Sequence, residues 1–473
     1  MPYCPGRTLL PTVGVETIPL SERSAPPSGS RAKGNDLNTH TRVRGVAATA
    51  ALATAGLLIA GCSGGGGGTE TTGGGGDFSD VTLNVAAAWS GAEQANFEAV
   101  LQKFTEDTGA TVNYTSFGDN GPTYLQGQLE GGSPPNVAIV GQPALMQSLA
   151  QNGDIMPVSA EVADEIAANY SQSWIDLGSV DGELYGVWFK AANKSTVWYN
   201  ADIYDGAGAT APEDWDGFME QLQLVQDSGY YGISVGADVG WPLTDWFENV
   251  YLRTAGAEKY DQLTNHEIPW TDPSVTEALE VMAQLWSSDV LQPGGAQRTF
   301  PESVTAVFGA NPEAGTVYEG DFVAGNITDD GNSVVGENAL FYNFPSINGS
   351  APAVVGGGDV AIQFTDDDAT SALMQYLASP DSASVWVPLG GLTSPNQNVD
   401  PSLYPDDTAR QIAEALTGAE TFRFDMSDLT PSAFGGTAGQ GFWQIMIDFY
   451  QDPTDIQGTQ EALEAAAVSA YGG

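Results

Sequence analysis

Cysteine and histidine are almost absent from this chain, and each absence excludes a kind of chemistry. Its 473 residues include two cysteines, Cys4 and Cys62, and two histidines, His40 and His266. These numbers exclude a zinc site built from several imidazole or thiolate ligands. They also leave almost nothing for a histidine-based triad or a cysteine nucleophile. We therefore expect no metal site, no cofactor and no catalytic residue of these kinds.

Basic residues are also scarce. Lys and Arg number 14 against 60 Asp and Glu, which gives a formal net charge of −46. A surface of this sign repels nucleic acid, anionic lipid and phosphorylated ligands. We expect no nucleic-acid partner and favour a neutral or cationic ligand. The same composition is also typical of adaptation to salt, and composition alone does not separate the two explanations.

No segment is long and apolar enough to span a membrane comfortably, which takes about 20 residues. The most apolar run, residues 45–60, is preceded by Arg42 and Arg44 and ends two residues before Cys62. A positive segment, an apolar segment and small residues before a cut are typical of a secretory signal. We predict that residues 1–61 form a leader and signal peptide that is removed.

Residues 59–62, IAGC, resemble the bacterial lipobox, in which a signal peptidase cuts before the cysteine and the thiol carries a diacylglycerol. The resemblance implies that Cys62 is lipidated and that the protein is anchored to the outer face of the cell membrane. A second acyl chain is expected on the new amino terminus, since stable anchoring requires more than one chain. We interpret the glycine-rich residues 62–77 as the lipidated cysteine and a flexible tether. A free cysteine in a disordered tail is the alternative.

Strand-like and helix-like patterns alternate after residue 80. Apolar residues predict strands over 81–85, 111–117 and 136–140, and helices over 97–104, ending at Gly109, and over 143–153. Strands that alternate with helices predict a largely parallel sheet with helices on both faces. Such sheets bind ligands beyond the carboxyl ends of their strands.

The second half of the chain continues this alternation. Residues 182–220 have the pattern of a crossing from one lobe to another, and a glycine-rich break precedes a strand that ends at residue 364. Thr365 is predicted to cap a helix whose first turn carries three aspartates, which suit the helix dipole. Further helices are predicted over 215–225, 441–450 and 459–471.

Several stretches in order along the chain resemble one protein family. They include WSGAEQANFEAVLQKFTEDTG, YGVWFKAANKSTVWYNADIY, VYEGDFVAG, GGGDVAIQF and GFWQIMIDFY. Together they resemble the extracellular solute-binding lipoproteins of bacterial ABC sugar importers, family 1, in the maltose and α-glucoside cluster. The resemblance implies an α/β, two-lobe, periplasmic-binding-protein-like (type II) clamshell, each lobe a sheet flanked by helices. Residues 78–191 and 359–415 would form lobe 1, and residues 192–358 and 416–473 lobe 2.

The resemblance also implies a function. The protein would be an extracytoplasmic monomer that captures a neutral sugar, an α-glucoside or another oligosaccharide, and delivers it to the transmembrane permease subunits of an ABC importer. One alternative keeps the fold and binds a cationic solute such as betaine, choline or a polyamine through aromatic rings and charge. A secreted glycoside hydrolase is a further alternative, since it needs only a pair of carboxylates. We expect no enzyme activity.

A neutral sugar needs aromatic plates and hydrogen-bonding groups. Trp89 and Glu93 follow the first predicted strand, although Ser90 and Glu93 also match a helix capping box. Trp241 follows a strand-like segment in a glycine-rich loop, whereas Phe322 and Trp443 are candidates by the resemblance. The full set of predicted ligand-binding residues is Trp89, Ser90, Glu93, Gln142, Trp241, Glu319, Asp321, Phe322, Asp359 and Trp443.

Some of these candidates have structural alternatives. Glu319 and Asp321 could simply hold their turn, Asp359 could lock the hinge, and Trp443 could be buried within its helix. The scarce lysines Lys190 and Lys194 lie near the first crossing. We predict that they form salt bridges between the lobes.

Replacing the predicted lipid-bearing residue tests the anchor. Cys62→Ser should leave the protein uncleaved or soluble, because no thiol remains to carry the diacylglycerol. The measurement is partition between membrane and soluble fractions of the producing cell, with Cys4→Ser, in the removed leader, as the control. Membrane partition of a cleaved Cys62→Ser protein equal to that of the original would contradict the assignment.

Overall fold

The computed structural model describes residues 77–472, so the predicted leader, Cys62 and nearly all of the predicted tether lie outside the described residues. One sheet has the strand order β12-β11-β3-β1-β2, and β6 also pairs with β11. Its strands are β1 (Thr82–Ala87), β2 (Thr111–Ser116), β3 (Val137–Val140), β6 (Gly186–Asn193), β11 (Val354–Gln363) and β12 (Phe422–Phe424). The first three strands run parallel, whereas β11 runs antiparallel to β3. A short pair, β4 (Ser179–Val180) and β5 (Glu183–Leu184), stands apart.

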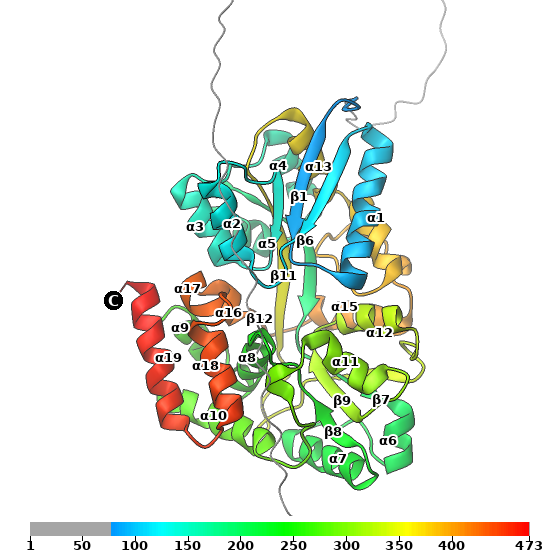
Figure 1. Cartoon of the computed structure of the whole chain (residues 1–473), viewed down its shortest axis with the longest axis vertical. Coiled ribbons are helices and arrows are strands. Elements are labelled where there is room, and N and C mark those ends of the chain that lie inside the picture. Colours follow the sequence, from blue (N-terminus) through cyan, green and yellow to red (C-terminus); the bar gives the residue numbers. More distant parts are fainter. Residues whose placement is uncertain (1–76, 473) are drawn as a thin grey trace, which may run out of the picture. The chain divides into compact units, whose positions relative to one another are not determined.

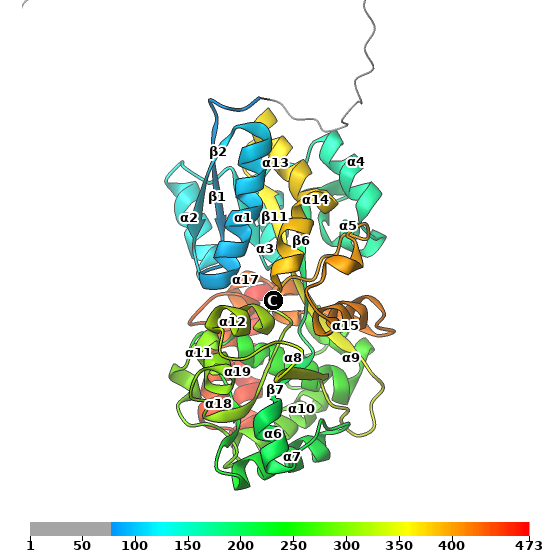
Figure 2. The ribbon, with the colours of Figure 1, turned by 90° about the vertical axis from the view of Figure 1, so that its right-hand side faces the viewer.

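Helices cover this sheet and form the first core with it. They are α1 (Gly91–Thr108), α2 (Gly121–Glu130), α3 (Pro143–Asn152), α4 (Ala160–Asn169), α5 (Gln172–Leu177), α13 (Asp368–Ala378) and α14 (Pro380–Trp386). Helix α1 buries Phe97, Val100, Leu101 and Phe104, the apolar face read from the sequence. It packs against α14, beside which it lies in Figure 2. The buried residues of this core come from positions 83–189 and 360–424.

The second sheet has the order β10-β7-β9-β8. Its strands are β7 (Thr196–Asn200), β8 (Tyr231–Ser234), β9 (Ala314–Glu319) and β10 (Ala339–Asn343). The helices around it are α6 (Ala201–Ala207), α7 (Trp215–Asp227), α8 (Trp241–Ala255), α9 (Ala257–Thr264), α10 (Pro273–Trp286), α11 (Phe300–Phe308), α12 (Val323–Asp330), α15 (Asp407–Thr417), α16 (Met426–Leu429), α17 (Ser432–Gly435), α18 (Gly441–Gln451) and α19 (Ile456–Tyr471). Helices α8, α10, α18 and α19 pack on one another and contribute to the second core.

The two cores are connected by the antiparallel pair β6 and β11, which run side by side in Figure 1. Strand β11 belongs to both cores, because Val355 is buried in the second and Val360 in the first. The register of the pair shifts between Asp359 and Val360, which marks a β-bulge. Strand β12 pairs in parallel with the beginning of β11 and leads the chain back to the second core.

Most of the predicted elements of the first half are confirmed. Helix α1 ends before Gly109, which has the left-handed φ of 78° expected of a glycine C-cap. The predicted cap of α13 is wrong. Asp367, not Thr365, accepts the capping bond from the amide of Thr370. The hydroxyl of Thr365 instead accepts a bond from Asn136 and donates one to Asp367.

The predicted lobe boundaries stay a prediction, although the two cores divide the chain in a similar way. Ile412 of α15 is a difference, since it packs with Trp198 and Val317 of the second sheet rather than with the first core. Within the described range 77–472, we find no helix with the length and apolarity needed to cross a membrane.

The glycines at the start of β11 are required by close packing. A Cβ on Gly358 would lie 2.7 Å from the Lys190 carbonyl oxygen and 3.1 Å from the Trp188 ring. We predict that Gly358→Ala lowers the free energy of unfolding by about 1–3 kcal/mol, as overpacked cores do. Urea denaturation measures the effect. The control is Gly127→Ala in the exposed part of α2, where a Cβ meets nothing within 4 Å. That change should raise stability by about 0.5–1 kcal/mol, and equal effects of the two substitutions would refute the packing argument.

Candidate functional site

A cavity of about 560 Å³ opens between the two cores. On the first core it is lined by the loops that follow β1, β2 and β3, which lie at the carboxyl ends of these parallel strands, where ligands bind such sheets. The β6 and β11 pair contributes Lys190 and Asp359, and the second core contributes Asp238, Trp241 and Phe322 among others. Eight predicted binding residues therefore line one cavity: Trp89, Ser90, Glu93, Gln142, Trp241, Phe322, Asp359 and Trp443. That they contact a ligand stays a prediction.

Aromatic rings of the second core form one wall of the cavity. Trp241, Phe300 and Phe322 meet edge to face, with ring centroids 5.3–6.0 Å apart. The predicted loop position of Trp241 is wrong, because this residue begins α8 with Pro242 behind it. Trp443, 6% exposed, also lines the cavity, and its buried indole N–H has no hydrogen-bond partner.

Gly240 allows the Trp241 and Trp443 segments to meet. It has a φ of 98°, and a Cβ there would lie 2.5 Å from the Trp443 carbonyl oxygen. Only glycine combines this backbone conformation with so close an approach. The position of Trp443 beside the start of α8 therefore depends on a residue without a side chain.

Trp89 lines the cavity from the first core, but most of its ring serves that core. It is 5% exposed and packs edge to face on Phe97 and Trp386, at centroid distances of 4.9 and 5.0 Å. A ligand would therefore meet only part of this ring. The plate is held rigidly, since its neighbours fix its orientation.

Lys190 is buried beside the aromatic rings that line the cavity. Its ammonium forms an ion pair with Glu93 and lies 5.4–5.6 Å from the ring centroids of Trp89, Phe322 and Trp386. Burial lowers the pKa of Lys190, but the charges of Glu93 and Asp359 outweigh it and leave that pKa raised. The Ser90 and Glu93 capping box is not formed, since the Ser90 side chain makes no capping bond.

Lys194 is likewise held by carboxylates, in this case those of the second core. Its ammonium lies 3.2 Å from an Asp245 oxygen, forms an ion pair with Asp425, and lies 5.9 Å from the centroid of the Trp241 ring. The lysines do form salt bridges, but the prediction that these bridges connect the two lobes is wrong. Each lysine pairs with carboxylates of its own core, and the contact of Lys190 across the cavity is with the Phe322 ring.

Asp359 faces Lys190 in the register of the β6 and β11 pair, and it lines the cavity. Burial raises the pKa of Asp359 to about 6, against the opposing charge of Lys190. That value includes a contribution from the nearby charge of Glu93, which also raises the pKa of Asp359. Asp359 therefore gains or loses its proton in a pH range where an exposed aspartate is always ionised.

Gln142 connects the two cores. Its Nε2 donates to the Gly436 carbonyl oxygen at 3.0 Å, which fixes the orientation of the amide, because a carbonyl can only accept. Its Oε1 is then left buried without a partner. A Cβ at Gly436 would collide with this amide. The position of the Gln142 amide therefore requires glycine at 436. Its Oε1 is an acceptor that no group of the protein uses.

Glu319 and Asp321 are placed outside the lining of the cavity. Glu319 ends β9 with its side chain 1% exposed. Asp321 is 5% exposed and has the structural role that was the alternative to ligand binding. Its carboxylate accepts a hydrogen bond from the Thr393 hydroxyl, and its backbone amide donates one to the Asn193 carbonyl oxygen. The turn presents Phe322 to the cavity instead.

Several lining residues were not predicted. Phe300 follows Thr299, whose capping box with Glu302 is formed and was readable as a helix start in the sequence. Asp119 lies in the loop after β2, so the rule of carboxyl strand ends could have indicated it. Asp428 belongs to the short helix α16, and no local pattern marks it.

Two α/β cores, joined by a pair of strands and lining one solute-sized cavity, define the class of two-lobe solute receptors. The chain belongs to the bacterial extracellular solute-binding protein family, which it matches over residues 88–384. The resemblance read from the sequence motifs is thereby confirmed. The protein is extracytoplasmic, as its family is.

Two relatives are similar over most of their length. The chain is 34% identical over 385 residues to the osmoprotective compounds-binding protein GgtB of Synechocystis, covering 78% of this chain and 89% of the relative. It is 32% identical over 391 residues to the alpha-glucosides-binding periplasmic protein AglE of Rhizobium meliloti, covering 79% and 84%. Both relatives are named as binding proteins rather than enzymes.

Solved structures show the same fold at lower identity. The bacterial solute receptor AcbH superposes with a TM-score of 0.71 at 22% identity, covering 82% of this chain and 98% of the receptor. RafE in complex with raffinose gives a TM-score of 0.68 at 16% identity, covering 82% and 99%. The type II periplasmic-binding-protein fold expected from the sequence is confirmed.

The raised pKa of Asp359 predicts a pH dependence of stability. A carboxyl group whose pKa rises on folding binds a proton in the folded state while the unfolded chain is ionised. The free energy of unfolding therefore falls as pH rises from about 4 to about 6. Asp359→Asn should fall less steeply than the original over this interval, measured by urea denaturation. Asp164→Asn, at an exposed position of α4, is the control. Parallel curves for the original and Asp359→Asn would contradict the prediction.

Proposed function

We propose that the protein is the solute-binding component of a bacterial ABC importer and that its ligand is a neutral sugar, an α-glucoside or another oligosaccharide. The relative AglE, 32% identical, is named for alpha-glucosides, and RafE, which shares the fold, binds raffinose. These similarities support the ligand class. The residues that line the cavity also support a neutral sugar as the ligand.

The observation that carries the proposal is the meeting of aromatic rings and unpaired polar atoms from both cores at one cavity. Trp241, Phe322 and Trp443 offer rings for the C–H faces of a sugar. The indole N–H of Trp443 is a donor without a partner, and Oε1 of Gln142 is an acceptor without one. A buried polar group left unpaired costs about 1–3 kcal/mol. Sugar hydroxyls, which donate and accept, can pair both atoms.

A cationic solute is the alternative, favoured by the carboxylates in the lining. The two lysines argue against it. Lys190 already occupies the ring faces of Trp89 and Phe322, and Lys194 lies against the ring of Trp241. A quaternary ammonium would have to share these faces with buried positive charges, which repel it.

Capture would join the two cores through the ligand and favour the closed form, which then docks on the membrane permease. The lipid at Cys62 would keep a monomeric receptor near that permease. We propose no enzyme activity. His266, the one histidine among residues 77–472, pairs with Glu464 at 3.2 Å and is not part of the cavity lining.

Removing an aromatic plate tests the sugar site. Trp443→Ala and Trp241→Ala should each weaken binding of an α-glucoside by about thirtyfold, corresponding to about 2 kcal/mol, because a desolvated aromatic anchor is lost. Titration calorimetry at low and moderate salt measures it. A neutral ligand predicts little change of affinity between the two salt concentrations.

Tyr230→Ala is the matched control, since this ring is 37% exposed and does not line the cavity. Unchanged affinity in both tryptophan variants would remove the stacking site from the proposal. If betaine, choline or spermidine bound in place of sugars, with a steep loss of affinity as salt rises, the ligand would be the cationic solute.

A further inference from the structure

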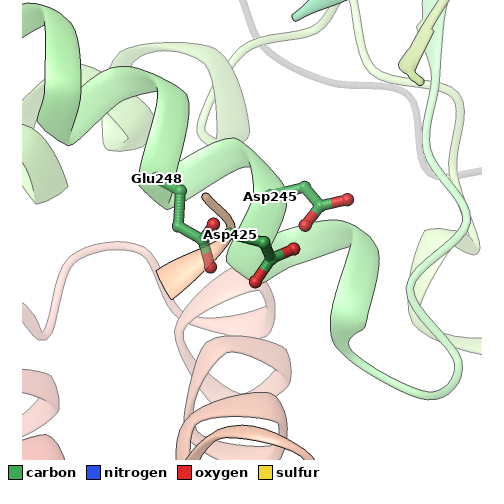
Figure 3. A group of neighbouring side chains, drawn as sticks. All are labelled: Asp245, Glu248 and Asp425. Atoms are coloured by element: carbon green, nitrogen blue, oxygen red, sulfur yellow. The ribbon is translucent and has the colours of Figure 1, made fainter. Parts of the chain in front are cut away.

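A second group of polar residues lies in the second core, beneath the cavity. Figure 3 shows Asp245 and Glu248, which come from α8, beside Asp425, which follows β12. Each offers a carboxylate oxygen, and these oxygens lie within 4.8 Å of one another. All three residues are fully buried, at 0% exposure. No metal site was expected from the sequence, because Asp245 and Asp425 are about 180 residues apart and no local pattern connects them.

The charge of the cluster is only partly balanced. Lys194 contacts Asp245 and Asp425, with the Asp428 carboxylate 3.9 Å away. Glu248 has no basic partner among the ion pairs found in residues 77–472. Its oxygens accept from the amides of Met426 and Ser427 at 2.8 and 2.9 Å. One ammonium thus lies near three fully buried carboxylates and the partly buried carboxylate of Asp428.

Glu319 adds an independent observation. This side chain is 1% exposed, and neither of its carboxylate oxygens has a hydrogen-bond partner. It faces the Asp245 carboxyl group at hydrogen-bonding range, and the second oxygen of Asp245 has no donor from any other residue. Three carboxylate oxygens on two buried residues therefore have no hydrogen-bond donor other than a proton held between the two carboxyl groups. Burial without a partner is costly for such groups, so a positive group between them would stabilise the fold.

We propose that this cluster binds one calcium ion, held by Asp245 and Glu319 with oxygens of Glu248 and Asp425. Calcium takes 6–8 oxygen ligands at about 2.4 Å in flexible geometry, so ligands on opposite sides of it lie about 4.8 Å apart. One carboxylate oxygen each of Asp245, Glu248 and Asp425 lies within this span of the other two. Magnesium fits less well, because it requires a near-ideal octahedron at about 2.0–2.1 Å and retains its waters.

The cluster lies next to the cavity. Lys194 and Asp428, at the edge of the cluster, both line the cavity. The ion would connect α8, the end of β9 and the turn after β12. These segments form the floor beneath Trp241 and lead into the turn that presents Phe322.

The experiment uses chelator-treated mature protein and measures thermal unfolding with calcium chloride, magnesium chloride or sodium chloride at matched ionic strength. Calcium should raise the unfolding temperature above the value in either other salt. Glu319→Gln should weaken the calcium effect at least tenfold in required concentration, and it should unfold at a higher temperature than the original without calcium, because a buried unpaired charge is gone. Glu280→Gln, at an exposed position of α10 in the same core, is the matched control and should respond to calcium as the original does.

A second measurement needs no variant. Terbium, a luminescent substitute for calcium, should emit when tyrosine and tryptophan are excited, since Tyr318 donates to the Asp245 carbonyl oxygen at 3.0 Å and Trp246 lies against Tyr318. Calcium should compete the signal away. Equal effects of the three salts, or a calcium effect that survives in Glu319→Gln, would overturn the proposal. In the first case the carboxylates share protons instead, and stability falls with rising pH in the original but less in Glu319→Gln. Sugar binding is measured separately, so either proposal can fail alone.

Discussion

Two buried ammonium groups determine how the acidic interior of this protein is arranged. Lys190 lies in the middle of β6, and Lys194 follows just after that strand, where the chain passes from the first core to the second. A buried carboxylate is tolerated when a positive group or a hydrogen-bond donor accompanies it. Because the chain has so few basic residues, the placement of these two decides where carboxylates such as Asp245 and Asp425 can be buried. It also decides which ring faces are already in contact with positive charge.

The fold was predictable where it follows from local pattern. The first three strands and the end of α1 depend on apolar spacing and on one glycine, and both signals lie within a few residues. The start of α8 was readable but overlooked, since proline at the second position is typical of a helix beginning. The cap of α13 was not readable. Thr365 and Asp367 can both cap a helix, and the bond between Thr365 and the distant Asn136 decides between them.

The candidate site was predictable to the level of its loops. Carboxyl strand ends indicated Trp89 and Gln142, and the family resemblance indicated Phe322 and Trp443. The directions of neighbouring side chains were not predictable, because at the end of β9 Glu319 turns inward while Phe322, three residues on, meets the cavity. Pairings across long separations were also out of reach. Lys190 and Glu93 are 97 residues apart, and no spacing rule connects them.

The bond from Gln142 to the Gly436 carbonyl joins the two cores with protein groups alone. The conformation that contains this bond is therefore populated even when no solute is bound. The apparent dissociation constant of a receptor equals its intrinsic constant divided by the populated fraction of the competent form. If the competent form is the one that contains this bond, a side chain at position 436, which would press on the amide, reduces that fraction. Uptake of every solute would then weaken by the same factor, while the ratio of affinities between solutes stays as the ring and hydroxyl contacts set it.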